Sequence, residues 1–187
     1  VSMEIILPDI PTQTRITSVL SAYDDLIENN EKRIRALEEM AQLLYTEWFV
    51  KPVKKGLPKG WEIKKLKDVA NIISGYAFKS SDFIETGIPV IKIKNITSKN
   101  TVDTNNTDFV SPAIITDRLS KYILKVADIV VAMTGATAGK VGRISTNQTM
   151  LLNQRVAKID PNSGYYSFVW GRIATEEAKN ELYRLAG

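Results

Sequence analysis

The sequence predicts an α+β protein in which a long N-terminal coiled-coil-type helix precedes a mixed α/β domain. Three observations support this fold class. Apolar residues recur in steps of four and three from Ile16 to Trp48, the periodicity of a helix that pairs with another helix. A segment rich in proline, glycine and lysine follows at residues 50–60, and beyond it short β-branched runs lie between turn signals. We assign residues 1–52 to the helix and residues 53–187 to the second domain.

The predicted helix starts at Asp9-Ile10-Pro11, where a carboxylate can cap the first turn and proline suits its geometry. One face carries an apolar seam at heptad spacing. Asn30 is its one strongly polar member, and a buried amide there would fix the register of a partner helix. A kink or a solvent-facing break at Asn30 is the alternative. We call these residues the helix seam: Ile16, Leu20, Tyr23, Ile27, Asn30, Ile34, Leu37, Ala41, Leu44 and Trp48.

A helix from Pro11 to Phe49 would be about 55–60 Å long at about 1.5 Å per residue, which is too long for a domain of this size to cover. The apolar seam therefore needs another surface. We expect the helix to pair with another helix or another protein, and the alternative is packing against the chain's own second domain.

The second domain shows several short strand patterns. We expect strands at residues 68–73, 88–93, 128–133, 141–144 and 156–159, because β-branched residues cluster there between turn signals. Helical composition returns at residues 165–186, which predicts a terminal helix.

The net charge of +4 is unevenly distributed along the chain. Residues 1–50 carry nine acidic and four basic side chains, whereas residues 51–187 carry 21 basic and 12 acidic ones. The two parts therefore have charges of −5 and +9, which predicts different partners for them. A strongly positive domain attracts a polyanion and gains affinity by releasing its condensed counterions.

The absence of cysteine and histidine from the sequence narrows the chemistry. It excludes disulfides, thiolate nucleophiles, histidine-based triads and zinc sites built from these residues. A carboxylate or lysine active site stays open, but we expect a non-catalytic protein without a metal site. The sequence has no run of about 18 apolar residues and no secretory signal at its start, so we expect a soluble, cytoplasmic protein with no membrane partner.

Basic and amide side chains of the second domain are candidates for contact with double-stranded DNA. Lysine and arginine suit phosphate oxygens, whereas asparagine, glutamine and arginine can also read base edges. Further polar side chains occur in the same segments of the sequence as these basic and amide residues: Thr97, Ser98, Asn100, Asn153 and Gln154. The predicted DNA-binding residues are Lys79, Lys92, Lys94, Asn95, Arg118, Lys121, Lys140, Arg143 and Arg155.

The segment TGATAGK at residues 134–140 has superficial similarity to a phosphate-binding loop. The spacing between Gly135 and Gly139 is too short, and Val141 stands where a serine or threonine would bind magnesium. We interpret the segment as a glycine-rich turn between two strands, whose backbone could closely approach a DNA phosphate.

Several motifs occur in the order found in one known family. In the helix they are LPDIPTQTRI at residues 7–16 and LIENNEKRIRALEEMAQLLYTEWF at residues 26–49. In the second domain they are LPKGWEIKKLKDVANIISGYAFKSSDF (57–83), GIPVIKIKNI (87–96), ADIVVAMTGATAGKVGRI (127–144) and LLNQRVAKI (151–159). With these motifs the chain resembles the specificity subunits of type I restriction-modification systems.

This resemblance implies a subunit without chemistry of its own. In the family, two target-recognition domains each read one half of a split DNA site, and antiparallel conserved helices hold them apart. The helices dock modification subunits, and a restriction and motor subunit completes the complex. S-adenosylmethionine, ATP and magnesium would then belong to partner subunits only. This chain resembles half of such a subunit, with one spacer helix and one recognition domain that is incomplete at its C-terminal end. We therefore expect a homodimer through the helix.

The resemblance also bears on which residues set the recognised sequence. Motif residues such as Gly135, Gly139 and Gln154 are shared by relatives with different targets, so we expect them to shape the site. Specificity is expected from residues 98–108 and 111–121. The alternative function is a stand-alone coiled-coil DNA-binding regulator, which would bind a complete operator by itself. An enzyme would need a pocket of convergent carboxylates or lysines.

Overall fold

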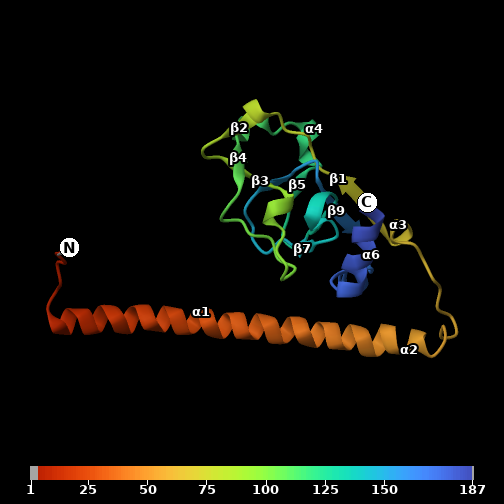
Figure 1. The fold of residues 1–187 in the computed structure, drawn as a ribbon, viewed down its shortest axis with the longest axis horizontal. Coiled ribbons are helices and arrows are strands. Elements are labelled where there is room, and N and C mark those ends of the chain that lie inside the picture. The colour runs from red at the N-terminus through yellow and green to blue at the C-terminus, as the bar shows by residue number, and fades with distance from the viewer. Residues whose placement is uncertain (1–3, 187) are drawn as a thin grey trace. The chain divides into compact units, whose positions relative to one another are not determined.

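A computed structural model describes residues 4–186 of the chain, which forms two units. A helical unit ends at Gly56 and a sheet-containing unit begins at Leu57. Figure 1 draws the first in red to orange and the second in yellow to blue. A long helix followed by a mixed α and β unit confirms the predicted fold class.

The helical unit begins where the sequence predicts. Helix α1 spans Ile10–Tyr45, and the Asp9 side chain accepts the backbone N–H of Thr12 at 3.3 Å. Pro11 lies in the first turn, where its missing N–H removes no helical hydrogen bond. The helix is continuous through Asn30, so the backbone is not interrupted at that residue.

The helix extends further than the sequence predicts. A π-helical turn, η1 (Thr46–Val50), leads into α2 (Lys51–Lys54), so helical structure continues two residues beyond the assigned boundary at residue 52 and into the segment interpreted as a linker. The backbone N–H of Lys51 bonds to the Thr46 carbonyl five residues back, and this wider turn directly precedes Pro52. Pro52 then stands in the first turn of α2, where proline is tolerated. Gly56, at φ +123°, follows the helix.

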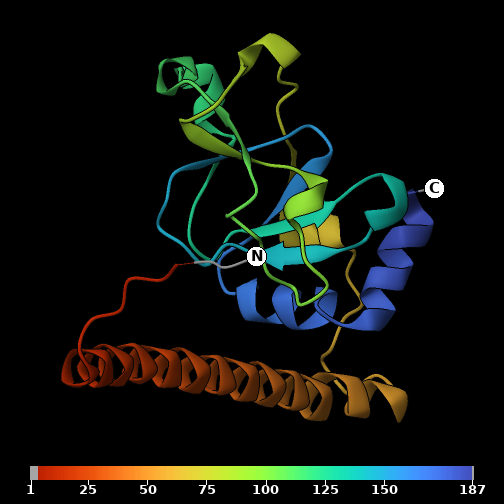
Figure 2. The ribbon, with the colours of Figure 1, turned by 60° about the vertical axis from the view of Figure 1, so that its left-hand side comes forward.

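The sheet unit contains a four-stranded antiparallel sheet in the order β1-β9-β6-β7. Its strands are β1 (Ala70–Ser74), β9 (Val156–Pro161), β6 (Ile129–Ala132) and β7 (Val141–Arg143), and all four confirm predicted strands. One face buries Ile129, Val141 and Ile159 against Val169 and Ile173 of helix α5. Helices α5 (Tyr166–Ile173) and α6 (Glu176–Ala186) are the blue helices in Figure 2.

The single terminal helix predicted for residues 165–186 is wrong, because the segment breaks into α5 and α6. Thr175 lies at the break. Its hydroxyl oxygen accepts the backbone N–H of Ala178 at 3.2 Å and also donates to the Arg172 carbonyl at 2.8 Å. This side chain competes with the backbone for hydrogen bonds and so ends one helix and starts the next.

A five-stranded sheet in the order β2-β4-β3-β8-β5 completes the unit. Only β3 (Ile88–Ile91) was predicted from the sequence. The strands that the sequence reading missed are β2 (Phe83–Ile84), β4 (Asp108–Val110), β5 (Ile123–Leu124) and β8 (Met150–Leu152). Strands β3 and β8 are parallel and the other pairs antiparallel. Ile91 and Leu152 share a buried cluster with Val130 and Val156 of the first sheet, so one core joins the two sheets.

Short helical turns connect the strands and carry several candidate residues. They are α3 (Leu66–Val69), η2 (Ser80–Asp82), η3 (Ile93–Asn95), η4 (Pro112–Ile114), α4 (Asp117–Ser120) and η5 (Gly135–Thr137). Across residues 4–186, none of the helices is both long and apolar enough to cross a membrane.

Candidate nucleic-acid interface

Two of the predicted DNA-binding lysines meet at one carboxylate beside the five-stranded sheet. The ammonium groups of Lys92 and Lys94 lie 2.9 Å and 3.2 Å from the same oxygen, Oδ2 of Asp108. The Lys92 ammonium also lies 3.8 Å from the centre of the Phe83 ring. Hydrogen bonds from Lys92 and then Lys94 lower the pKa of Asp108. The three groups carry a net charge of +1 and are partly exposed, which suits contact with a phosphate.

Asn95 does not lie on the surface, so its prediction as a base-contacting residue is wrong. Only 1% of the residue is exposed. Its side-chain amide donates to the carbonyls of Asp103 and Asn106 at 3.1 and 2.9 Å, and its Oδ1 accepts the Lys92 N–H at 2.9 Å. The amide replaces water for three backbone groups inside the unit, which is a structural role.

The other predicted residues at this sheet are exposed. Lys79 precedes η2, where its backbone N–H bonds to Asp82 at 2.7 Å and its side chain is left to solvent. Arg118 lies on α4, and the Lys121 ammonium lies 5.0 Å from the centre of the Tyr122 ring. Arg155 is exposed in the turn between β8 and β9. These exposed positions leave the side chains accessible to a ligand.

Arg143 lies on β7 of the four-stranded sheet, and Lys140 directly precedes that strand. The Arg143 guanidinium lies 5.1 Å from the centre of the Trp170 ring, so it packs on α5 as well as facing the surface. Lys140 follows the glycine-rich turn and is partly buried. The structure thus brings Lys92 and Lys94 together at one carboxylate, whereas Arg143 and Lys140 lie on and next to a strand of the other sheet.

The glycine-rich turn packs closely against helix α6 at Gly139. A Cβ added at Gly139 would lie 2.4 Å from the Lys179 carbonyl oxygen and 2.8 Å from the Tyr183 nitrogen, both in α6. Gly139 is buried and has φ +80°, so it lets the turn between β6 and β7 pack on that helix. The expectation that this backbone approaches a phosphate is therefore wrong at Gly139, whereas Gly135 in the same turn is exposed.

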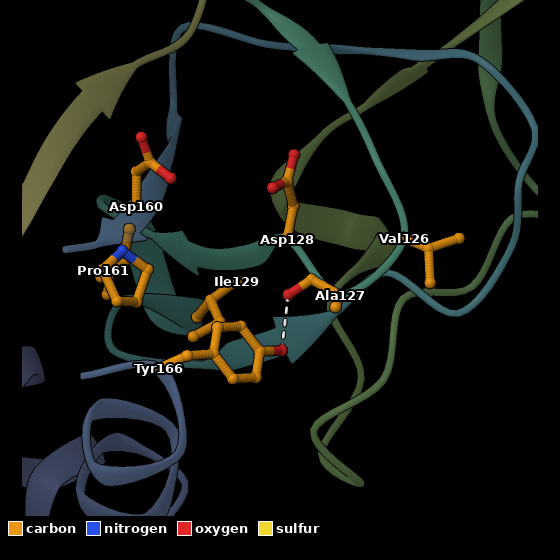
Figure 3. Close-up of a pocket in the computed structure, with 8 residues that line it drawn as sticks. Val126, Ala127, Asp128, Ile129, Asp160, Pro161 and Tyr166 are labelled. Atoms are coloured by element: carbon orange, nitrogen blue, oxygen red, sulfur yellow. Dashed lines mark hydrogen bonds between the residues drawn. The ribbon is translucent and has the colours of Figure 1, made fainter. Parts of the chain in front are cut away.

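A small hollow of about 240 Å³ lies between the β5–β6 connection, the end of β9 and the start of α5 (Figure 3). The Tyr166 hydroxyl donates to the Ala127 carbonyl at 2.6 Å across it, and burial raises the pKa of this phenol. Asp128 lies 3.5 Å from the Lys158 ammonium, and its carboxylate also accepts the Lys125 N–H at 2.9 Å. The Asp128 charge is thus already compensated. Within the described part of the chain, acidic side chains form no group of three or more suited to a metal ion.

The helix seam forms a second candidate surface, in the helical unit. Its large apolar members are between 40% exposed, at Leu44, and 64% exposed, at Tyr23. Salt bridges Glu28–Lys32 and Glu31–Arg35, at 2.6 and 3.6 Å, occupy other positions of the same helix. An exposed heptad seam on a 36-residue helix is the usual feature of a helix that pairs with another.

Two solved structures are similar in fold to this chain. The HsdS subunit from Thermoanaerobacter tengcongensis superposes with a TM-score of 0.55 and 20% identity, over 97% of this chain and 44% of that one. The type I restriction-modification S subunit from M. genitalium gives 0.56 and 16%, over 95% and 44%. The fold is therefore that of a type I specificity subunit.

Comparison with known sequences identifies the family to which the chain belongs. The family model for the type I restriction modification DNA specificity domain matches residues 58–181. The type I restriction enzyme MjaVIII specificity subunit of Methanocaldococcus jannaschii is 30% identical over 98% of this chain, and the EcoAI specificity subunit of Escherichia coli is 34% identical over 54%. The chain belongs to the family of type I restriction-modification specificity subunits. It spans about half, 47%, of the length of the M. jannaschii relative.

Proposed function

We propose that residues 57–187 recognise one half of a split double-stranded DNA target for a type I restriction-modification complex. The observation that carries this proposal is the match of the specificity-domain family to residues 58–181, which are nearly the whole sheet unit. The charge of +9 on residues 51–187 supports it, because DNA binding by a basic surface releases counterions.

In this proposal the chain binds and positions DNA while other subunits perform the reactions. The modification subunit would contribute S-adenosylmethionine and methylate the target, and the restriction and motor subunit would contribute ATP- and magnesium-dependent activity in the cytoplasm. The role of this chain's own residues is to hold phosphates and read bases.

The helical unit is proposed to dock the modification subunit and to pair with a second copy of this chain. The exposed helix seam supports this, because pairing would remove its apolar side chains from water. A second helix would also complete the pair that the family uses to separate two recognition domains. The negative charge of residues 1–50 keeps this unit away from DNA.

Sedimentation analysis of the full chain tests the pairing. Ile27→Asp places a charge in the seam, and each copy loses the burial of one isoleucine, about 1.5 kcal/mol, so the dimer should weaken about 100-fold. Asn29→Asp is the matched control, since it lies two residues on, about 200° around the helix. A wild-type chain that stays monomeric at high concentration, or equal effects of both variants, would contradict the pairing.

Selection from a randomised duplex library tests the recognition. The chain is mixed with its modification subunit, and bound duplexes are sequenced; we expect a split sequence to be enriched with the subunit and little enrichment without it. A complete operator bound tightly by the chain alone would instead identify a stand-alone regulator. No enrichment under either condition would reject the proposal.

A phosphate-contact variant checks how binding is achieved. Lys79→Gln should lower affinity equally for all duplexes and reduce the slope of log affinity against log salt by about one unit. Lys79 is suited to this test because its structural hydrogen bond uses only its backbone N–H. An unchanged slope would remove Lys79 from the proposed surface.

A further inference from the structure

One segment of the sheet unit combines a fixed backbone with free polar side chains. Residues 97–107, TSKNTVDTNNT, connect η3 with β4, and we call them the polar loop. Ten of these eleven residues are polar or charged, and Lys99 and Asp103 give the loop a net charge of zero. The loop is the yellow-green segment that extends to β7 in Figures 1 and 2, where Thr101 pairs with Arg143.

Asn95 fixes the base of the polar loop. Its buried amide holds the carbonyls of Asp103 and Asn106, and its own backbone carbonyl accepts the Asp103 N–H at 2.8 Å. The Lys92 N–H bonds to the same side chain. One interior residue thereby connects the segment just before the loop with the C-terminal half of the loop.

A second set of contacts fixes the turn of the loop. Asn100 adopts φ +59°, a conformation that asparagine tolerates, and its amide donates to the Ala174 carbonyl at 3.3 Å. The Asn100 carbonyl accepts the Arg143 N–H at 3.1 Å, and Val102 is 7% exposed. A Cβ at Gly142 would come within 3.0 Å of this part of the loop, so β7 and the loop are closely packed.

Despite these contacts, the loop leaves several side chains exposed, among them Ser98, Lys99, Asn105 and Asn106. The Asn105 backbone is held by an Asx turn, in which its N–H bonds to the Asp103 carboxylate at 2.9 Å. An asparagine amide presents a donor beside an acceptor, the pattern that pairs with an adenine edge in the major groove. A fixed backbone lets such a contact form with little loss of conformational freedom.

We propose that the polar loop reads base edges through Asn105 and Asn106, with Asn95 as the positioning residue that holds the loop. Lys92 and Lys94 lie beside its base and contact phosphate. The inference rests on the proposed function and adds the residues that set the target. Neutral amides contribute to sequence choice without contributing to counterion release, whereas the lysines do the reverse.

The test repeats the randomised-duplex selection with full-length chains and their modification subunit. Asn105→Ala and Asn106→Ala are compared with Asn147→Ala, an exposed asparagine between β7 and β8. At least one loop variant should lose about 5- to 150-fold discrimination at one or two positions of the target, with the salt slope unchanged. The Asn147 variant should select the wild-type sequence.

Other outcomes separate this inference from the proposed function. Loop variants that bind DNA and select the wild-type sequence would overturn the inference. A change in the selected sequence with Arg118→Ala would then place the base contacts in the segment of residues 111–121 instead. A wild-type complex that enriches no sequence would reject the proposed function itself. Asn95→Ser should relax the same target positions as the loop variants, and a fall in affinity that is uniform across sequences would refute its positioning role. If that variant fails to fold, the Asn105 and Asn106 variants still decide.

Discussion

Replacing Gly139 with alanine separates backbone strain from packing in the glycine-rich turn. Gly139 and Gly164 have nearly equal φ values, +80° and +85°, so alanine meets the same left-handed strain at both, about 1 kcal/mol. Gly164 has no atom within 4 Å of an added Cβ, whereas Gly139 has the Lys179 carbonyl oxygen at 2.4 Å. Overpacking adds about 2 kcal/mol at Gly139 alone. The expected losses of unfolding free energy are therefore about 3 and about 1 kcal/mol.

Urea titration measures this difference. Trp170 packs against the core of the sheet unit, so its fluorescence reports on that unit once Trp48 and Trp61 are replaced by phenylalanine. With a slope of about 1.5 kcal/mol per M, the midpoint should fall by about 2 M for Gly139→Ala and by about 0.7 M for Gly164→Ala. Equal shifts would show that the turn does not pack on α6 and would reopen a ligand-binding role for its backbone.

Three further predictions concern stability. Asn95→Ala removes three buried hydrogen bonds at about 1 kcal/mol each, so unfolding free energy should fall by about 3 kcal/mol; a loss below about 1 kcal/mol in urea titration would contradict its structural role. Thr175→Ala removes the cap of α6 and should lose about 1 kcal/mol, measured in the same way, and an unchanged midpoint would argue against the cap. The pKa of Asp108 is lowered in the folded state, so its contribution is present at neutral pH and is lost as the pH falls through that lowered pKa. Asp108→Asn should therefore be less stable than wild type at neutral pH, with a gap that begins to narrow below about pH 4 and closes below the lowered pKa. A gap independent of pH would count against the lysine pairing.

Most features of the long helix could be predicted from the local sequence pattern. Its start depends on Asp9 and Pro11, and its exposed face depends on the spacing of apolar residues, both of which are readable from a few neighbouring positions. The extension of the helix to Lys54 could not be predicted from neighbouring residues. The lysines, glycines and prolines of residues 50–60 indicated a boundary, whereas a π-helical turn allowed Pro52 to continue the helix.

The two sheets differ in how well their strands could be predicted from the sequence. Strands of the four-stranded sheet have enough consecutive β-branched residues to be predicted, and all four were. Strands β2 and β5 have two residues each, and β4 and β8 have three. Segments this short are not long enough to show an alternation of apolar and polar residues. They become strands only when partners distant in the sequence supply their hydrogen bonds.

The sequence by itself determined the family, the helix with its seam, and the separation of charge between the two units, since composition and short-range periodicity encode these properties. Only the tertiary structure decided which polar residues are free to contact a ligand. Asn95 has the side chain of a base reader, yet its amide is used by backbone groups eight and eleven residues away. Gly139 suggested an approach to phosphate, yet α6 occupies the space beside it. Burial and hydrogen-bond satisfaction depend on contacts between distant segments, and no local pattern contains them.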